Sequence, residues 1–118
     1  MFTDISNAIN RSNNILIIPH YNADGDCLGS SYALKLMLQE LGKKADVILD
    51  EKDYDNRILK ILDGVSCKND AFTPDLVISV DCADKQRMGT RVSAFDSCDF
   101  TINLDHHVTN DKYATYKI

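Results

Sequence analysis

Short apolar stretches recur along the chain, and they predict the strands of a sheet. The stretch at 14–19 is continuously apolar and rich in branched residues, which is typical of a strand covered on both faces. The stretch at 100–104 instead alternates between apolar and polar residues. We expect strands at residues 14–19, 45–49, 76–80, 100–104 and, at the end of the chain, 113–118.

Between these stretches, apolar residues repeat every three or four positions, which predicts helices. They are expected at 2–11, 27–41 and 53–64, with an irregular segment at 65–73 and a loop with a short helix at 82–96. In the second helix Lys35 should point away from the apolar stripe, which comprises Leu34, Met37, Leu38 and Leu41. Asp26 is expected to cap the start of this helix, and Gly42 suits its end because glycine tolerates left-handed geometry.

The alternation of strands and helices determines the predicted fold class. Strands joined through helices form a mainly parallel sheet with right-handed crossovers and helices on both faces. A chain of 118 residues with 44% hydrophobic residues is long enough to bury one core. We therefore expect a single α/β domain with a Rossmann-like, three-layer arrangement.

Charge and composition exclude several classes of function. A net charge of −5 disfavours binding to long duplex nucleic acid, although a small anionic substrate is compatible if metal ions supply positive charge locally. No apolar run approaches the roughly 20 residues that cross a bilayer, and the N-terminus lacks a basic region followed by an apolar one. The four cysteines are scattered without a C-x-x-C pair, as in reduced proteins. These features predict a cytoplasmic protein.

The side chains with candidate chemistry follow the predicted strands. The carboxyl ends of parallel strands meet at one edge of a sheet, where open α/β folds bind ligands. Three strand ends therefore bring carboxylates and imidazoles together: His20, Asp24 and Asp26, then Asp81, then Asp105, His106 and His107. Taken singly, these residues could be turn and cap residues, a solvated strand end and surface histidines. Together they predict a metal site.

The composition of this set indicates which metal and which chemistry. Carboxylates with histidine, and no necessary thiolate, suit Mn²⁺, Mg²⁺ or Fe²⁺ better than structural zinc. We interpret Cys27 and Cys82 as packing residues. The carboxylates suffice for two ions, one of them bridging, and two such ions activate water for phosphoryl hydrolysis. No serine or cysteine nucleophile motif and no Gly-rich phosphate loop competes with this interpretation.

Three segments together resemble motifs of the DHH phosphoesterase family. His20 to Asp26, with Leu28-Gly29-Ser30, resembles the first motif, and Val80 to Asp84 resembles the second. Asp105-His106-His107 is similar to the triplet that gives the family its name. The resemblance is greatest to the NrnA-like branch, which contains nano-RNase/pAp phosphatases and cyclic dinucleotide phosphodiesterases.

The resemblance implies a role for each residue. His20 and Asp24 would hold one Mn²⁺, Asp26 and His106 the other, and Asp81 would bridge the two ions, with Mg²⁺ or Fe²⁺ as alternatives. His107 would contact substrate phosphate. Asp105 and Asp84 would orient their neighbours from behind, and Asn22 and Ser30 are candidate phosphate contacts.

Members of the family continue past the triplet to a fourth acidic motif and a C-terminal substrate-binding domain. Residues 1–118 therefore correspond to the N-terminal part of a DHH phosphoesterase domain, and we expect this piece to bind metal weakly and hydrolyse little. The complete protein would hydrolyse short oligonucleotides, pAp-type nucleotides or cyclic dinucleotides. A manganese-dependent inorganic pyrophosphatase and a non-catalytic nucleotide-sensing module remain alternatives, and the oligomeric state stays open, a homodimer included.

Overall fold

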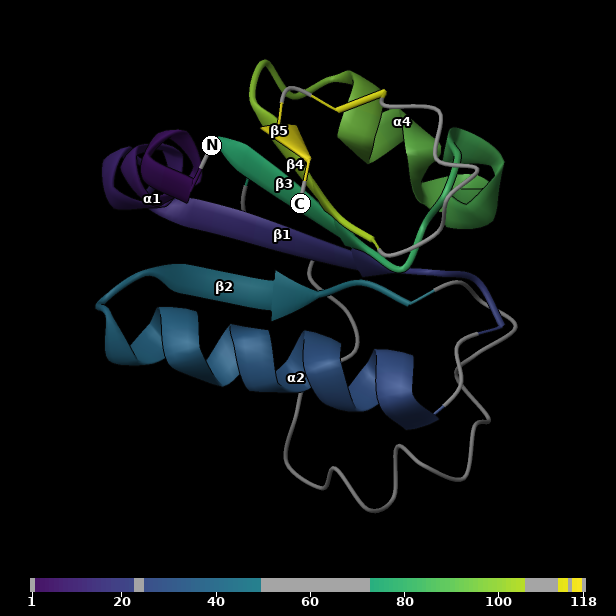
Figure 1. Cartoon of the computed structure of the whole chain (residues 1–118), viewed down its shortest axis with the longest axis horizontal. Helices are drawn as coiled ribbons and strands as arrows, with labels where there is room; N and C mark the ends of the chain where they lie inside the picture. The colour runs from purple at the N-terminus through teal and green to yellow at the C-terminus, as the bar shows by residue number, and fades with distance from the viewer. Residues whose placement is uncertain (1, 23–24, 50–72, 106–112, 115, 118) are drawn as a thin grey trace.

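The computed structural model describes residues 2–22, 25–49, 73–105, 113–114 and 116–117. These residues form alternating helices and strands around one sheet (Figure 1). The helices are α1 (Phe2–Arg11), α2 (Gly25–Glu40), the 3-10 helix η2 (Lys85–Arg91) and α4 (Val92–Asp96). The strands are β1 (Asn14–Pro19), β2 (Lys44–Val47), β3 (Leu76–Val80), β4 (Thr101–Leu104) and β5 (Tyr116–Lys117).

The sheet is parallel and has the strand order β2-β1-β3-β4-β5. Ile17 in the middle of β1 lies beside Val47 on one side and Ile78 on the other. The predicted α/β class is thereby confirmed, and β1 and β3 have the predicted bounds. β5 is shorter than the strand expected at 113–118. The helix expected at 53–64 lies outside the described residues, as does the irregular segment apart from its last residue.

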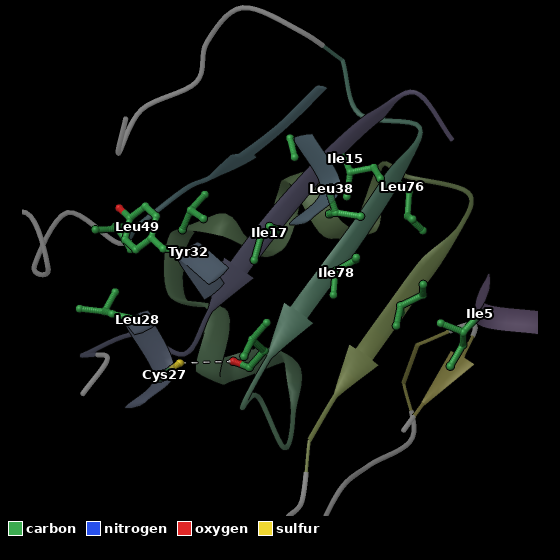
Figure 2. Packing of buried hydrophobic residues seen from close by; sticks show 14 of the residues in the cluster. Ile5, Ile15, Ile17, Cys27, Leu28, Tyr32, Leu38, Leu49, Leu76 and Ile78 are labelled. Atoms are coloured by element: carbon green, nitrogen blue, oxygen red, sulfur yellow. Dashed lines mark hydrogen bonds between the residues drawn. The ribbon is translucent and has the colours of Figure 1, made fainter. Parts of the chain in front are cut away.

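Alternate residues of the central strands point to opposite faces and build two apolar clusters. Ile15 and Ile17 join the cluster formed with α1 and α2, whereas Leu16 and Ile18 join the one formed with η2 and α4. Figure 1 shows α2 on one side of the sheet and α4 on the other. Figure 2 shows the α2 side, where Leu38 packs among strand residues. Each fully buried isoleucine or leucine contributes about 1.5–3 kcal/mol, so the central strands are firmly held.

The buried face of α2 differs from the predicted one. Met37 and Leu41 are 53% and 59% exposed, whereas Lys35, expected to face elsewhere, is 6% exposed. The side chains that face inward are Cys27, Leu28, Ser31, Tyr32, Lys35 and Leu38. The physical reason is an ion pair: the Lys35 ammonium lies 3.0 Å from the Asp46 carboxylate on β2. The predicted stripe was therefore wrong for all but Leu38 and the partly buried Leu34.

Asp46 also binds a backbone amide on the outer edge of β2. The Ile48 N–H donates to the Ile17 carbonyl on β1, and because neighbouring amides along a strand point in opposite directions, the Val47 N–H faces away from β1. That N–H donates to Asp46 Oδ1 at 2.8 Å. One carboxylate oxygen thus accepts hydrogen bonds from both Lys35 and the outward-facing amide.

The two ends of α2 test two further predictions. After the helix, the N–H groups of Lys43 and Gly42 donate to the carbonyls of Leu38 and Gln39, and Gly42 has φ 82°. This is the left-handed termination expected at Gly42. At the other end α2 begins at Gly25, so Asp26 lies inside the first turn and is not the N-cap residue. Its negative charge still interacts favourably with the positive end of the helix dipole.

Candidate metal and phosphate site

The end of β1 is held against the neighbouring strand and against η2. The His20 N–H donates to the Val80 carbonyl at 3.1 Å, and the Tyr21 N–H donates to the Arg87 carbonyl at 2.7 Å. The rings of His20 and Tyr21 stack with centroids 5.0 Å apart, and His20 Nδ1 contacts the Tyr21 carbonyl oxygen. Asn22 follows in a left-handed conformation with φ 55° and an exposed side chain.

Asp81 follows the last residue of β3 and has an unusual backbone conformation. Its φ is 62°, a left-handed value that costs a non-glycine residue about 1 kcal/mol or more and that aspartate tolerates better than most. Its N–H donates to the Leu104 carbonyl at 2.8 Å, which joins the ends of β3 and β4. The strand ends are therefore tied together where the left-handed turn begins.

A cavity of about 380 Å³ opens at this edge, between α2 and the ends of β3 and β4. Aspartates from three elements line it: Asp26 from α2, Asp81 after β3 and Asp105 after β4. Ser30 also lines it, and the remaining lining residues are Cys27, Leu34, Val80 and Leu104. Four predicted site residues from three separate segments thus line one space.

Other predicted site residues lie elsewhere. Asp84 accepts a hydrogen bond from the Arg87 N–H at 3.2 Å and caps η2. His20 and Asn22 follow β1 and do not line the cavity. Asp24, His106 and His107 lie outside the described residues, so their assigned roles stay predictions.

The chemistry of the cavity suits a hard cation. Three of the described lining residues are aspartates, and none is a lysine or arginine. Oxygen donors of this kind favour Mn²⁺ or Mg²⁺. Within the described part of the chain, no three His, Cys, Asp or Glu side chains gather closely enough to hold an ion alone. Two of the five predicted ligands, Asp24 and His106, fall outside that part.

Sequence reasoning missed a polar cluster beside this edge, made of Ser79, Asn103 and Tyr113. Ser79 and Asn103 are 0% and 1% exposed, and Tyr113 is partly buried. Burial raises the pKa of Tyr113 above its ordinary value. The only signal in the sequence was Ser79, a polar residue inside the otherwise apolar β3. In β4 the alternation of Thr101, Ile102 and Asn103 is typical of a strand with one solvent-facing side, so it gave no sign that Asn103 is buried.

The two cysteines nearest the cavity lie on opposite faces of the sheet. Cys27 Sγ lies 3.7 Å and Cys82 Sγ 3.6 Å from the Val80 carbonyl oxygen, and Figure 2 shows the contact of Cys27. Cys27 belongs to the cluster under α2, whereas Cys82 belongs to the cluster under η2 and α4. Burial raises the pKa of Cys82 to about 12, although the nearby Arg91 lowers it. Both side chains fill space around the end of β3.

Comparison with solved structures supports the fold. An exopolyphosphatase-related protein from Bacteroides fragilis superimposes with a TM-score of 0.72 at 18% identity, covering 98% of this chain and 37% of that protein. At this identity the likeness concerns the fold alone. It agrees with the parallel sheet and the two covering layers described above.

Comparison of sequences identifies the family. The model of the DHH family, N-terminal domain, matches residues 14–118. The bifunctional oligoribonuclease and PAP phosphatase NrnA of Thermus thermophilus is 30% identical over 110 residues, which cover 84% of this chain. This chain spans only 29% of the length of that relative. The match extends from β1 through the Asp105-His106-His107 triplet, and we conclude that the chain belongs to the DHH family, in its NrnA-like branch.

Proposed function

We propose that the complete protein is a metal-dependent phosphoesterase that hydrolyses short oligonucleotides, pAp-type nucleotides or cyclic dinucleotides. The observation that carries this proposal is the convergence of Asp26, Asp81 and Asp105 on one cavity at the carboxyl edge of the sheet. The relative named as an oligoribonuclease and PAP phosphatase supports the substrate class. Short nucleotides also suit the net charge of −5, which disfavours long duplex nucleic acid.

Two Mn²⁺ ions are the proposed cofactors, with Mg²⁺ or Fe²⁺ as alternatives. We assign Asp26 and Asp81, together with His20, Asp24 and His106, to hold them. When bound, such ions lower the pKa of a shared water and neutralise charge on a phosphoryl oxygen.

The remaining residues would bind and orient the substrate. Ser30 lines the cavity from α2, where its hydroxyl can donate a hydrogen bond to a phosphate oxygen. Within the triplet we assign the phosphate contact to His107, and Asn22 would contact either the phosphate or a neighbouring site residue. Asp105 would orient the neighbouring histidines, and Asp84 would fix the loop after Asp81 by capping η2.

The decisive experiment compares two variants of the complete protein that alter the two ends of β3. Asp81→Ala removes the proposed bridging ligand and is expected to lower Mn²⁺-dependent hydrolysis of pAp and of a dinucleotide about a thousandfold. Asp75→Ala, at the opposite end of β3, is the matched control and should stay within about twofold of the wild type once it is folded.

The same assay separates the alternatives. Release of phosphate from pyrophosphate, with no turnover of pAp or dinucleotide, would indicate a manganese-dependent inorganic pyrophosphatase. Nucleotide binding without hydrolysis of any of these substrates would indicate a sensing module. An Asp81→Ala variant as active as the wild type would contradict the proposal, because hydrolysis would then occur without the bridging carboxylate.

We also propose a cytoplasmic location. Cys27, Cys82 and Cys98 are free thiols, which suits a reducing compartment. Among the described helices, none has the length and apolar character needed to cross a membrane. Whether the protein works as a homodimer is a matter for measurement of its mass in solution.

A further inference from the structure

The cluster of Ser79, Asn103 and Tyr113 joins the ends of β3 and β4 to the segment that precedes β5. Asn103 Nδ2 lies 2.8 Å from Ser79 Oγ and 2.9 Å from the Tyr113 hydroxyl. Ser79 Oγ lies 3.0 Å from the same hydroxyl. The three side chains therefore contact one another in every pairing.

Two members of the cluster bind the same backbone group, the Cys82 carbonyl. The Tyr113 hydroxyl donates to this oxygen at 2.7 Å, and Asn103 Nδ2 donates to it at 3.1 Å. Since Tyr113 uses its single proton there, its oxygen remains free to accept from Asn103 and from Ser79. Asn103 Nδ2 carries two hydrogens, so it donates to two of its three oxygen neighbours at a time.

This carbonyl is one peptide past Asp81, the residue with φ 62°. On the other side of Asp81, its own N–H is bound to the Leu104 carbonyl. Both sides of the left-handed residue are therefore fixed to β4 or to Tyr113. A strained conformation persists only where its surroundings determine it, and these contacts do so.

The position of the cluster in the sequence adds a second observation. Asn103 comes just before Asp105-His106-His107, and Tyr113 follows the triplet. The two residues that bind the Cys82 carbonyl thus flank the triplet on both sides. The cluster ties the turn at Asp81 to residues on both sides of Asp105-His106-His107 in the sequence.

Stability alone is a weak explanation for such a cluster. Apolar residues of similar shape in place of a buried hydrogen-bonded pair are often neutral or stabilising, and a single donor would satisfy the Cys82 carbonyl. Two donors from different segments instead restrict its orientation. Residues that orient a metal ligand from behind typically change affinity 10- to 100-fold when altered.

We propose that Asn103 and Tyr113 are positioning residues that hold the Asp81 carboxylate toward the cavity and thereby set the affinity for a divalent cation. This inference rests on the proposed function, because it assumes that Asp81 binds the cation. Neither residue need touch substrate or metal for this role.

The test uses the complete protein and titrates it with MnCl₂ alone in a calorimeter. Tyr113→Phe removes the hydroxyl while keeping the ring that packs edge-on against Phe95, 5.3 Å between centroids. Ile15→Val is the control, because it alters the buried amino-terminal part of β1 and costs about 0.5–1.5 kcal/mol, similar to one lost hydrogen bond. Asn103→Leu serves as a second variant if it folds.

We expect Tyr113→Phe to bind Mn²⁺ about tenfold more weakly than the wild type, and Ile15→Val to bind it equally well. Equal affinity of Tyr113→Phe and wild type would overturn the positioning role while leaving the proposed function intact. Equal weakening in Tyr113→Phe and Ile15→Val would overturn it too, since the cause would be general loss of stability. A wild-type protein that binds no Mn²⁺ would remove both the proposed function and this inference.

Discussion

The two ends of β3 each carry an aspartate, and the two are used in opposite ways. Asp75, before the strand, accepts hydrogen bonds from the N–H groups of Asn13 and Asn14, both at 2.9 Å. Asp81, after the strand, sits on a left-handed backbone and lines a cavity with two other carboxylates. The same residue type thus binds the start of β1 at one end of β3 and is a candidate metal ligand at the other end.

The difference teaches that surroundings, and not residue type, assign a carboxylate its role. At the amino end, backbone N–H groups of the start of β1 point at Asp75 and use both of its oxygens. At the carboxyl end, the structure gathers negative charge instead. A cation bound in the cavity would add positive charge beside these aspartates.

A third aspartate, Asp46, has a third role, and loss of its partner is expected to have the largest effect on stability. Asp46 and Lys35 form a buried ion pair whose side chains are 12% and 8% exposed. Lys35→Met should lower the free energy of unfolding by about 3–5 kcal/mol, because it leaves a buried carboxylate without its cation. Urea denaturation measures this loss.

The control for this variant is the pair Lys35→Met/Asp46→Asn. It should recover most of the lost stability, since no uncompensated charge remains. If the single variant were as stable as the wild type, burial of Asp46 would not matter and the contrast among the three aspartates would weaken.

A smaller effect is expected at the amino end of β3. Asp75→Ala leaves the N–H groups of Asn13 and Asn14 to water, and because these contacts are exposed, we expect a loss of about 1–2 kcal/mol, similar to the loss of a helix cap. Urea denaturation would show it. A variant as stable as the wild type would contradict the anchoring role of Asp75.

Two buried groups near the cavity, Cys82 and Tyr113, should make the free energy of unfolding depend on pH. Burial raises the pKa of Cys82 to about 12 and also raises that of Tyr113. The folded state therefore keeps protons that the unfolded chain loses above about pH 8.5, so stability is full below that pH and falls as the pH rises toward 12. The slope is about 1.4 kcal/mol per pH unit for each retained proton.

Urea denaturation at pH 8, 9 and 10 measures this slope. Cys82→Ala should flatten it by removing one of these groups, although Cys98, whose pKa burial also raises, retains part of the slope. An identical slope in the variant and the wild type would show that Cys82 ionises equally in both states.

Much of this arrangement could be predicted from the sequence, for physical reasons. The bounds of β1 and β3 were predictable because strands buried on both faces are continuously apolar. The convergence of Asp26, Asp81 and Asp105 followed from parallel topology alone. The buried face of α2 did not, because Lys35 turns inward only in the presence of Asp46 on another element.

The cluster around the Cys82 carbonyl was hidden for a related reason. Asn103 and Ser79 are polar, and a hydrophobicity pattern assigns polar strand residues to the solvent. Their burial depends on Tyr113, which contributes a hydroxyl from a different segment. Whether such a polar residue is buried depends on partners distant in sequence, and a local hydrophobicity pattern contains no information about them.

The outward-facing amide of Val47 bears on whether a strand of another copy of this protein can pair with β2. β2 is an outer strand of the described sheet, and an outer strand with unoccupied amides invites another chain to pair with it and begin aggregation. Here the Asp46 carboxylate already occupies that amide, and the adjacent Lys35 adds a charge that an incoming strand would have to displace. The contact that joins α2 to β2 thus also leaves this amide without a free hydrogen for an incoming strand.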